Sequence, residues 1–435
     1  MPSALDRPAW TWRELVVVGG GSLLLGMLFG YPALADLRAL GAGGDWDQHL
    51  FFHWVPYETV TRFGQLPLWN PWACGGTPML ANPQARFLSP FFLLHLGAGP
   101  VVALHLEIVL HLALAAAGGY YLGRELKLGL VARAAVALVF LGTSAHSLHL
   151  AMGHTWALSY AWFPWVLALA SRALATSRLT PAIAAGGLLA LIVYEGGIYP
   201  APQAALLLAL LCLGDAVRAR RLFPLGAAAV SAAVAAGLSA PKLLPTLALM
   251  WQHPRRTEAL ESMDWGLLLD ALFSRDQTLG RAVAPQQGLT WGFHEYGAYL
   301  GPAAALLVVA GLVLARRRSL AFAALGAVFL VLALGRIPLA GGEGSLGLWP
   351  LLHELPVFGS QHVPSRFLVP FILCAAVVAG LGADALARRW PRWGAVAAAA
   401  MVAVGAIDAW RVGPPNLWRL YDAPQGPAGA PGPFR

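Results

Sequence analysis

The sequence predicts an all-α polytopic membrane protein. Of its 435 residues, 58% are hydrophobic and only 11% are charged, whereas an ordinary soluble domain carries about 25% charged residues. Several apolar runs approach the roughly 20 residues that cross a hydrocarbon core as a helix. A membrane β-barrel would instead show short segments of alternating polarity.

About eleven spans are expected, within a range of roughly 9 to 13. They form one transmembrane domain over residues 1–411, and a Pro/Gly-rich external tail follows at 412–435. Residues 86–96 are too few to cross, so they predict an interfacial or re-entrant helix. The expected spans are 14–34, 101–122, 130–148, 155–169, 181–194, 201–213, 222–250, 298–314, 320–334, 367–386 and 393–410.

The positions of the basic residues predict the topology. If the N-terminus is cytoplasmic, very short loops on the cytoplasmic side hold 16 of the 29 lysines and arginines. This is the bias that the positive-inside rule describes. The large loops at about 35–99, 251–297 and 336–365 then face outward. The cytoplasmic residues are Arg7, Arg13, Arg124, Lys127, Arg133, Arg172, Arg178, Arg218, Arg220, Arg221, Arg316, Arg317, Arg318, Arg388, Arg389 and Arg392.

Two other classes of protein are disfavoured by composition. The net charge of +8 is spread over loops, not gathered on a basic face with interleaved aromatics, so no nucleic-acid partner is expected. The three cysteines, Cys74, Cys212 and Cys374, form neither a disulfide framework nor a CxxC motif.

The first external loop is the most polar long stretch near the N-terminus. Asp45 and Asp47 follow the first span, and a helix that began at Asp45 would carry Asp45, His49 and His53 on one face. Such a face could supply a general base or bind a divalent metal. Alternatively, these are solvated charges with an N-cap aspartate.

The same loop continues into LWNPWACGGTPMLANPQ, residues 68–84, a run of turn-forming residues. It could hold aromatic rings and backbone groups in fixed positions against a sugar or a lipid headgroup. Trp69 and Trp72 could equally belong to an interfacial aromatic belt.

Ionisable residues within or beside apolar segments are functional candidates. Lys242 lies inside the seventh span and requires an anionic partner, and Arg366 at the outer start of the tenth span suits a lipid phosphate. Arg366 could also be a flanking residue that reaches the interface. The other candidates are Glu107 with His111, Glu195 at a helix break, and the pair His294 and Glu295. His146, His149 and His154 cluster at one outer hairpin, where they could form a metal site or be interfacial histidines.

Four motifs together resemble the bacterial YfhO-type membrane proteins, within the multi-span glycosyltransferases of the GT-C fold. They are Asp45 with Gln48, the block from Gly64 to Gln84, Glu295 with Tyr299 and Gly301, and the VPSRF segment from Val363 to Phe367. The resemblance extends over most of the chain. Many proteins of this type continue further beyond the segment equivalent to Arg366.

The resemblance implies transfer of a sugar from a polyprenyl-phosphate carrier to a glycan, polymer or lipid acceptor, at the outer face of the bacterial cytoplasmic (inner) membrane. It implies Asp45 as the catalytic base, with Asp47 as substitute, and Arg366 or Lys242 at the carrier phosphate. No cofactor is required; a divalent cation (Mg or Mn), if present, would use Asp47, His49 or Glu295. The substrate-binding candidates are Gln48, Trp69, Asn70, Asn82, Gln84, His294, Glu295 and Tyr299.

Two other functions compete with sugar transfer. A flippase for lipid-linked sugars would use Glu107, Glu195 and Lys242 as a charged internal pathway, although the two halves of the chain show no clear internal repeat. A non-catalytic assembly partner is the third alternative. The effect of Asp45→Asn on transfer distinguishes the enzyme from the other two.

Overall fold

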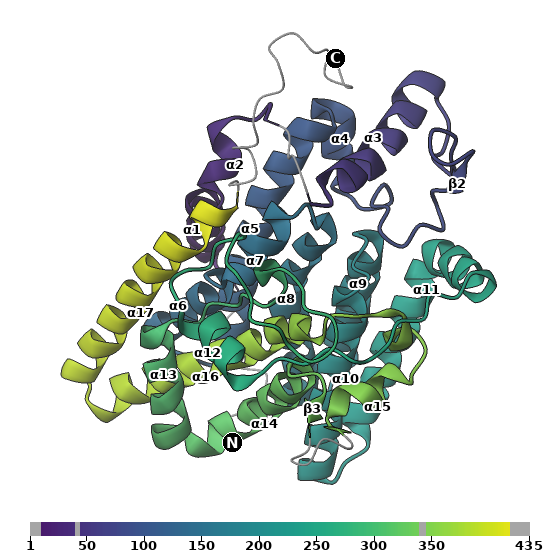
Figure 1. Ribbon diagram of the computed structural model, residues 1–435. Helices are drawn as coiled ribbons and strands as arrows, with labels where there is room; N and C mark the ends of the chain where they lie inside the picture. The colour runs from purple at the N-terminus through teal and green to yellow at the C-terminus, as the bar shows by residue number, and fades with distance from the viewer. Residues whose placement is uncertain (1–9, 40–43, 339–344, 418–435) are drawn as a thin grey trace.

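The computed structural model describes residues 10–39, 44–338 and 345–417, and these are mostly helical (Figure 1). Arg7 and the part of the predicted tail beyond residue 417 lie outside them. Seven helical segments of the described chain are long and apolar enough to cross a membrane, in agreement with an all-α membrane protein. They are α1 (Trp12–Phe29), α5 (Pro100–Glu125), α6 (Leu130–Leu141) with α7 (Ser144–Ala151), α10 (Pro200–Ala219), α11 (Phe223–Gln252), η4 (Pro364–Phe367) with α16 (Leu368–Arg389), and α17 (Trp393–Val412) with η5 (Pro414–Asn416).

A helix lies at each of the eleven predicted spans, but four of these helices fall short of a full span by length or polarity. α9 (Thr180–Tyr194) and α13 (Pro302–Leu314) are apolar but short. α8 (Phe163–Thr176) has 14 residues because the predicted fourth span begins as a 3-10 helix, η1 (Thr155–Trp162). α14 (Arg316–Ala333) opens with three arginines. The number of crossings beyond seven therefore stays a prediction.

The core of the bundle is built around α16, which packs against α6, α13 and α14. Its residues from Leu368 to Asp384 are almost all buried. Gly382 and Gly311 allow the backbones of α16 and α13 to touch: a Cβ on Gly382 would lie 2.0 Å from the carbonyl oxygen of Leu307. Close approach through small residues is a common way for membrane helices to associate.

The loops that hold the predicted cytoplasmic arginines are physically joined. Arg318 donates to the carbonyl oxygen of Leu126 at 2.8 Å and lies 3.3 Å from Asp384. Arg388 lies 2.8 Å from the same carboxylate, and Arg221 donates to a carbonyl oxygen at the end of α8 at 2.8 Å. These loops thus gather at one end of the bundle, as the charge pattern requires. The assignment of that end to the cytoplasm stays a prediction.

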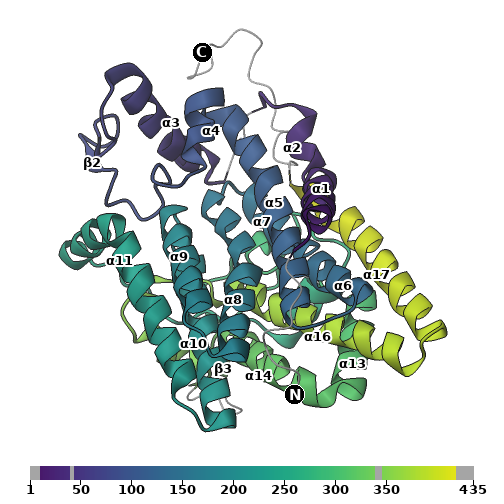
Figure 2. The ribbon, with the colours of Figure 1, turned by 180° about the vertical axis from the view of Figure 1, so that it is seen from behind.

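The predicted first external loop forms a second helical and turn-rich region. α3 (Trp46–Phe63) and the antiparallel ribbon of β1 (Trp69–Asn70) and β2 (Thr77–Pro78) stand at one end of the molecule, beside α2 (Tyr31–Ala35) and α4 (Phe92–Ala98) (Figures 1 and 2). The helix considered after Asp45 is present as α3, which begins at Trp46 with Asp45 in the cap position. The expected helix over 86–96 is shorter, because residues up to Phe91 form turns and only α4 is helical.

The other polar segments follow α11 and α14. They bring η2 and the start of η4 against the loop between α7 and η1, so that residues far apart in the sequence meet. The short elements in these segments are α12 (Trp265–Phe273), η2 (Phe293–Glu295), β3 (Ile337–Pro338), β4 (Ser345–Leu346), α15 (Leu348–His353) and η3 (Phe358–Ser360).

Candidate functional site

Asp45 lies where the chain enters α3, but its carboxylate does not cap that helix. Instead, one carboxylate oxygen lies 3.2 Å from Nε2 of His154. The Asp45 side chain is 53% exposed, whereas that of His154 is 6% exposed. The backbone N–H of Asp45 donates to the carbonyl oxygen of Met152 at 2.8 Å. A buried imidazole therefore holds an accessible carboxylate in one orientation.

The charges at this contact are set by the hydrogen bond and by burial. The hydrogen bond from His154 holds the pKa of Asp45 below its usual range. Burial lowers the pKa of His154, although the bond to Asp45 opposes this shift. A carboxylate only accepts, so Nε2 of the neutral His154 ring carries the proton, and Nδ1 accepts from Nδ1–H of His149 at 3.0 Å. Asp45 is thus ionised and oriented at neutral pH.

Local backbone geometry explains why α3 meets the His154 loop. Gly153 has a φ of +86°, and a Cβ on it would lie 2.6 Å from the backbone nitrogen of Trp46. The indole nitrogen of Trp46 donates to the carbonyl oxygen of Ala151 at 2.9 Å. Only glycine allows this close approach without strain, so Gly153 sets the distance between the two sides of the site.

Glu295 and Arg366 form a buried ion pair behind Asp45 and His154. The Arg366 guanidinium donates through Nε and NH2 to the two carboxylate oxygens of Glu295, at 2.7 and 2.5 Å. It also lies over the rings of Tyr199 and Trp156, at 3.9 and 4.7 Å from their centroids. Burial acts to raise the pKa of Glu295, but Arg366, His294 and His149 together hold the pKa well below its usual range. The charge of Arg366 is therefore largely compensated within the protein.

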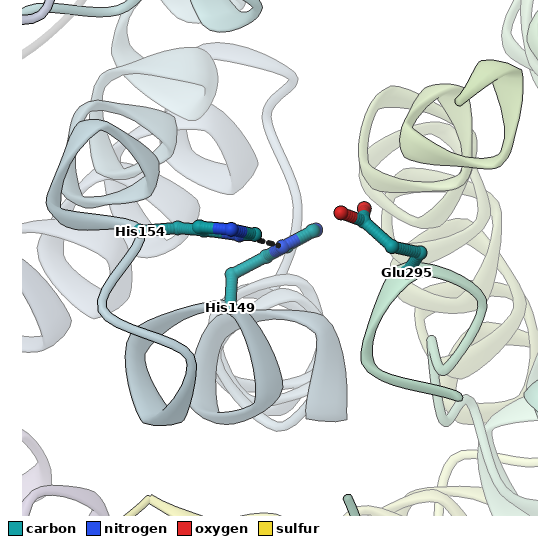
Figure 3. A group of neighbouring side chains, drawn as sticks. All are labelled: His149, His154 and Glu295. Carbon is teal, nitrogen blue, oxygen red and sulfur yellow. Dashed lines mark hydrogen bonds between the residues drawn. The ribbon is translucent and has the colours of Figure 1, made fainter. Parts of the chain in front are cut away.

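His149, His154 and Glu295 could hold a metal ion, because one ligand atom from each lies within 4.8 Å of the others. Figure 3 shows the Glu295 carboxylate turned toward the two rings. Two imidazoles with one carboxylate suit zinc or a similar transition metal better than magnesium. Here all three residues already have partners, since His149 binds His154 and both oxygens of Glu295 accept from Arg366.

The ligand set predicted for Mg or Mn, namely Asp47, His49 and Glu295, is a different one. His49 is buried in α3, and its Nδ1 lies 2.9 Å from the hydroxyl of Thr155. Asp47 and Gln48 are exposed on the first turn of α3. The helix turns Asp47 away from the buried face that carries His49, so the set found within the described residues shares only Glu295 with the predicted one.

In the turn-rich block after α3, two asparagine side chains stabilise turns of the neighbouring backbone. Oδ1 of Asn70 accepts from the backbone of Trp72 at 3.0 Å, and Oδ1 of Asn82 accepts from the backbone of Gln84 at 2.9 Å. Both are side-chain turns of the kind that asparagine favours. Trp69 is 53% exposed and lies on Gly76, where a Cβ would meet its ring at 2.5 Å. Trp69 and Trp72, which is 41% exposed, are therefore accessible aromatic rings of this block, which we call the platform (residues 68–84).

The two remaining residues of the predicted substrate site take different positions. His294 lies 3.5 Å from Glu295, and its ring is 5.7 Å from that of His154. Tyr299 is buried, and its hydroxyl donates to Asp408 in α17 at 2.5 Å. His294 thus joins the cluster, whereas Tyr299 ties η2 to the bundle.

A second buried polar cluster joins Arg86, just after the turn-rich block, to side chains of α3, α4 and α5. Arg86 lies 2.7 Å from one carboxylate oxygen of Glu107, and His95 binds the other at 2.9 Å. His53 stacks on His95, with ring centroids 4.6 Å apart. Within the described residues, Nε and NH2 of Arg86 have no hydrogen-bond partner. The Glu107 carboxylate therefore pairs across the fold. Its helical neighbour His111 contacts only the Glu107 backbone carbonyl, at 2.7 Å, and binds the Glu195 carboxylate at 3.2 Å.

Lys242 lies beside this second cluster. Its Nζ donates to the carbonyl oxygen of Ala85, the neighbour of Arg86, so its partner is a backbone group and not the expected anion. Lys242 also lines an apolar pocket of about 100 Å³ with Pro83, Ile198 and Met250. An ammonium group has three donors, so Lys242 could still receive an anion there.

Sequence reasoning missed Arg86 as a site residue, and it left His149 and His154 open between a metal site and interfacial histidines. The structure buries His146, His149 and His154 within the protein. The available signal was Gly153 beside His154, since a glycine next to a polar residue often marks close backbone approach. Arg86 was expected at the start of an interfacial helix, and its neighbours in the sequence gave no sign that it would pair with Glu107.

Comparison with known proteins adds no family assignment. Neither protein-family models nor curated proteins match this chain.

Proposed function

We propose that the chain is a membrane glycosyltransferase of the GT-C class, related to the YfhO-type proteins. It moves a sugar from a polyprenyl-phosphate carrier to a glycan or lipid acceptor on the outer face of the bacterial cytoplasmic membrane. The observation that carries the proposal is the contact between Asp45 and His154: an accessible aspartate that leaves its own helix uncapped and is held by a buried imidazole.

In this reaction Asp45 accepts the proton of an acceptor hydroxyl, and the hydroxyl oxygen forms a bond to C1 of the sugar. The bond between C1 and the phosphate oxygen breaks, and the carrier phosphate leaves with the electron pair. His154 keeps Asp45 ionised and oriented, as a base requires. Trp69 offers an exposed ring to the sugar.

The leaving phosphate needs a cation, and the contacts favour Lys242 over Arg366. Arg366 already donates to both oxygens of Glu295. Lys242 lines an apolar pocket that suits an isoprenoid chain, whereas Arg86 is buried against Glu107. We therefore assign Lys242 to the phosphate and Arg366 to the framework of the site.

The test is sugar transfer by the purified protein in liposomes, with polyprenyl-phosphate sugars and a panel of hydroxyl acceptors. Asp45→Asn should reduce turnover by about 10²- to 10⁴-fold, the contribution of a general base. Asp36→Asn is the matched control, because it removes an exposed carboxylate from the same predicted loop and should retain turnover within about threefold.

Two outcomes would count against the proposal. Equal turnover by wild type and Asp45→Asn would exclude Asp45 as the base. Movement of the lipid-linked sugar between leaflets without transfer would favour the flippase, for which Glu107, Glu195 and Lys242 were the expected pathway. Glu107 and Glu195 are both held in buried pairs, which is less suited to a moving substrate.

A further inference from the structure

A cavity of about 890 Å³ lies at the basic end of the bundle, away from Asp45, between α8, α10 and α14. Its inner walls are apolar, and its rim carries arginines from two loops. The walls include Leu210, Gly214, Ala321, Ala324, Leu325 and Val328.

The rim has an excess of positive charge. Arg218 and Arg221 both contact Asp215, at 2.5 and 2.7 Å. Arg318 contacts Asp384, which Arg388 also neutralises, and Arg317 is exposed. The side chains of Arg218 and Arg318 remain 73% and 47% exposed, so they can reach a ligand.

We propose that this cavity, the basic-end groove, binds an anionic phospholipid, with its phosphate among Arg218, Arg221, Arg317 and Arg318 and an acyl chain along Ala324 and Leu325. The charge of the rim is complementary to a phosphate, and guanidinium groups bind phosphate in a bidentate manner. Basic pockets between transmembrane helices bind lipid headgroups in this way. The apolar walls select a lipid over a free phosphate, because a soluble anion would leave them uncovered.

The site is independent of the proposed sugar transfer. It lies at the end where the basic loops meet, whereas Asp45 lies at the start of α3 beside the His154 loop. A lipid seated between α14 and the α8–α10 pair would bridge helices from the two halves of the chain. We therefore expect it to stabilise the fold.

The test uses delipidated protein in detergent, titrated with cardiolipin, phosphatidylglycerol, phosphatidylethanolamine and inorganic phosphate, and followed by native mass spectrometry and thermal unfolding. Both anionic lipids should bind and raise the unfolding temperature, whereas phosphatidylethanolamine and inorganic phosphate should not. The double variant Arg218→Gln/Arg317→Gln should weaken cardiolipin binding by about tenfold. Arg389→Gln/Arg392→Gln is the matched control, because it removes two exposed arginines from another loop of the basic end.

A second pair of variants tests the acyl chain. Ala324→Trp fills the groove without changing charge and should abolish bound lipid that survives detergent, whereas Ala327→Trp, on the exposed side of the same helix outside the groove, should not. Equal weakening by the two arginine pairs would show unspecific surface attraction and overturn the proposal. Unchanged binding in both Arg218→Gln/Arg317→Gln and Ala324→Trp would overturn it as well.

Discussion

Glu295 and Arg366 face each other in a two-point ion pair, with side chains 4% and 5% exposed. They come from segments 71 residues apart. The pair fixes η2 against the start of η4, and Ser365 strengthens the contact by donating to the carbonyl oxygen of Glu295 at 2.7 Å. The framework behind Asp45 depends on this pair.

Replacing one member should destabilise the protein strongly. Glu295→Gln leaves the Arg366 charge buried without compensation, which typically costs about 3–5 kcal/mol. Thermal unfolding of the purified protein in detergent measures the effect. Glu58→Gln breaks the more exposed helical pair with Arg62 and should cost less than about 0.5 kcal/mol. Similar losses in the two variants would contradict a structural role for the Glu295–Arg366 pair.

Acidification should destabilise the fold through buried histidines outside the spans. Burial lowers the pKa of His49 to about 3 and that of His362 to about 4. Between roughly pH 6.5 and 4 the unfolded chain binds protons that the folded chain excludes. The free energy of unfolding should therefore fall as pH falls through this window.

The variant His49→Asn tests that assignment. The variant lacks one group that binds a proton in the unfolded chain but not in the folded chain. Its free energy of unfolding should therefore fall less steeply between pH 6.5 and 4 than that of wild type. At pH 7 it should lose about 1–3 kcal/mol, because the Thr155 hydroxyl loses the closer of its two buried histidine partners, His49 at 2.9 Å and His53 at 3.4 Å. His253→Asn, at an exposed histidine, should leave the slope unchanged. If the free energy of unfolding of His49→Asn falls with pH as steeply as that of wild type, the assignment to His49 is wrong.

Gly153→Ala should loosen the contact between Asp45 and His154. The new Cβ would meet the backbone of Trp46, in addition to the strain of a positive φ. Gly64→Ala is the control, since Gly64 also has a positive φ but open space around it, and its cost should be only about 1–2 kcal/mol. Unfolding in detergent compares them, and a loss in Gly153→Ala no larger than in Gly64→Ala would argue against the predicted clash.

Metal removal should have no effect on the protein. Glu295, His149 and His154 are already bound to one another or to Arg366, so a cation would have to displace these contacts. We expect purified protein to contain much less than one equivalent of metal by elemental analysis, and its unfolding temperature to be the same with and without EDTA. A stoichiometric ion whose removal lowers that temperature would show that the His149, His154 and Glu295 set is a metal site.

The sequence by itself determined the class of protein and the position of its helices. Long apolar runs leave their backbone groups only helical partners in lipid, so a helix lies at every predicted span. One short-range signal was also confirmed: the chain breaks between α9 and α10 around Gly196, whose φ is +70°. The lengths of the helices were less predictable. The 3-10 helix η1 takes up the first part of the expected fourth span and so shortens α8, and three arginines make the first turn of α14 polar.

Tertiary structure decided which polar groups meet. Asp45 pairs with His154, Glu295 with Arg366, and Glu107 with Arg86 and His95 rather than with His111. Each pairing joins separate elements, and helical spacing predicts only neighbours three or four residues apart. A buried charge requires a partner, so the sequence could state that Glu107 and Lys242 would be satisfied. It could not identify the partners, because they depend on which loops fold against which helices.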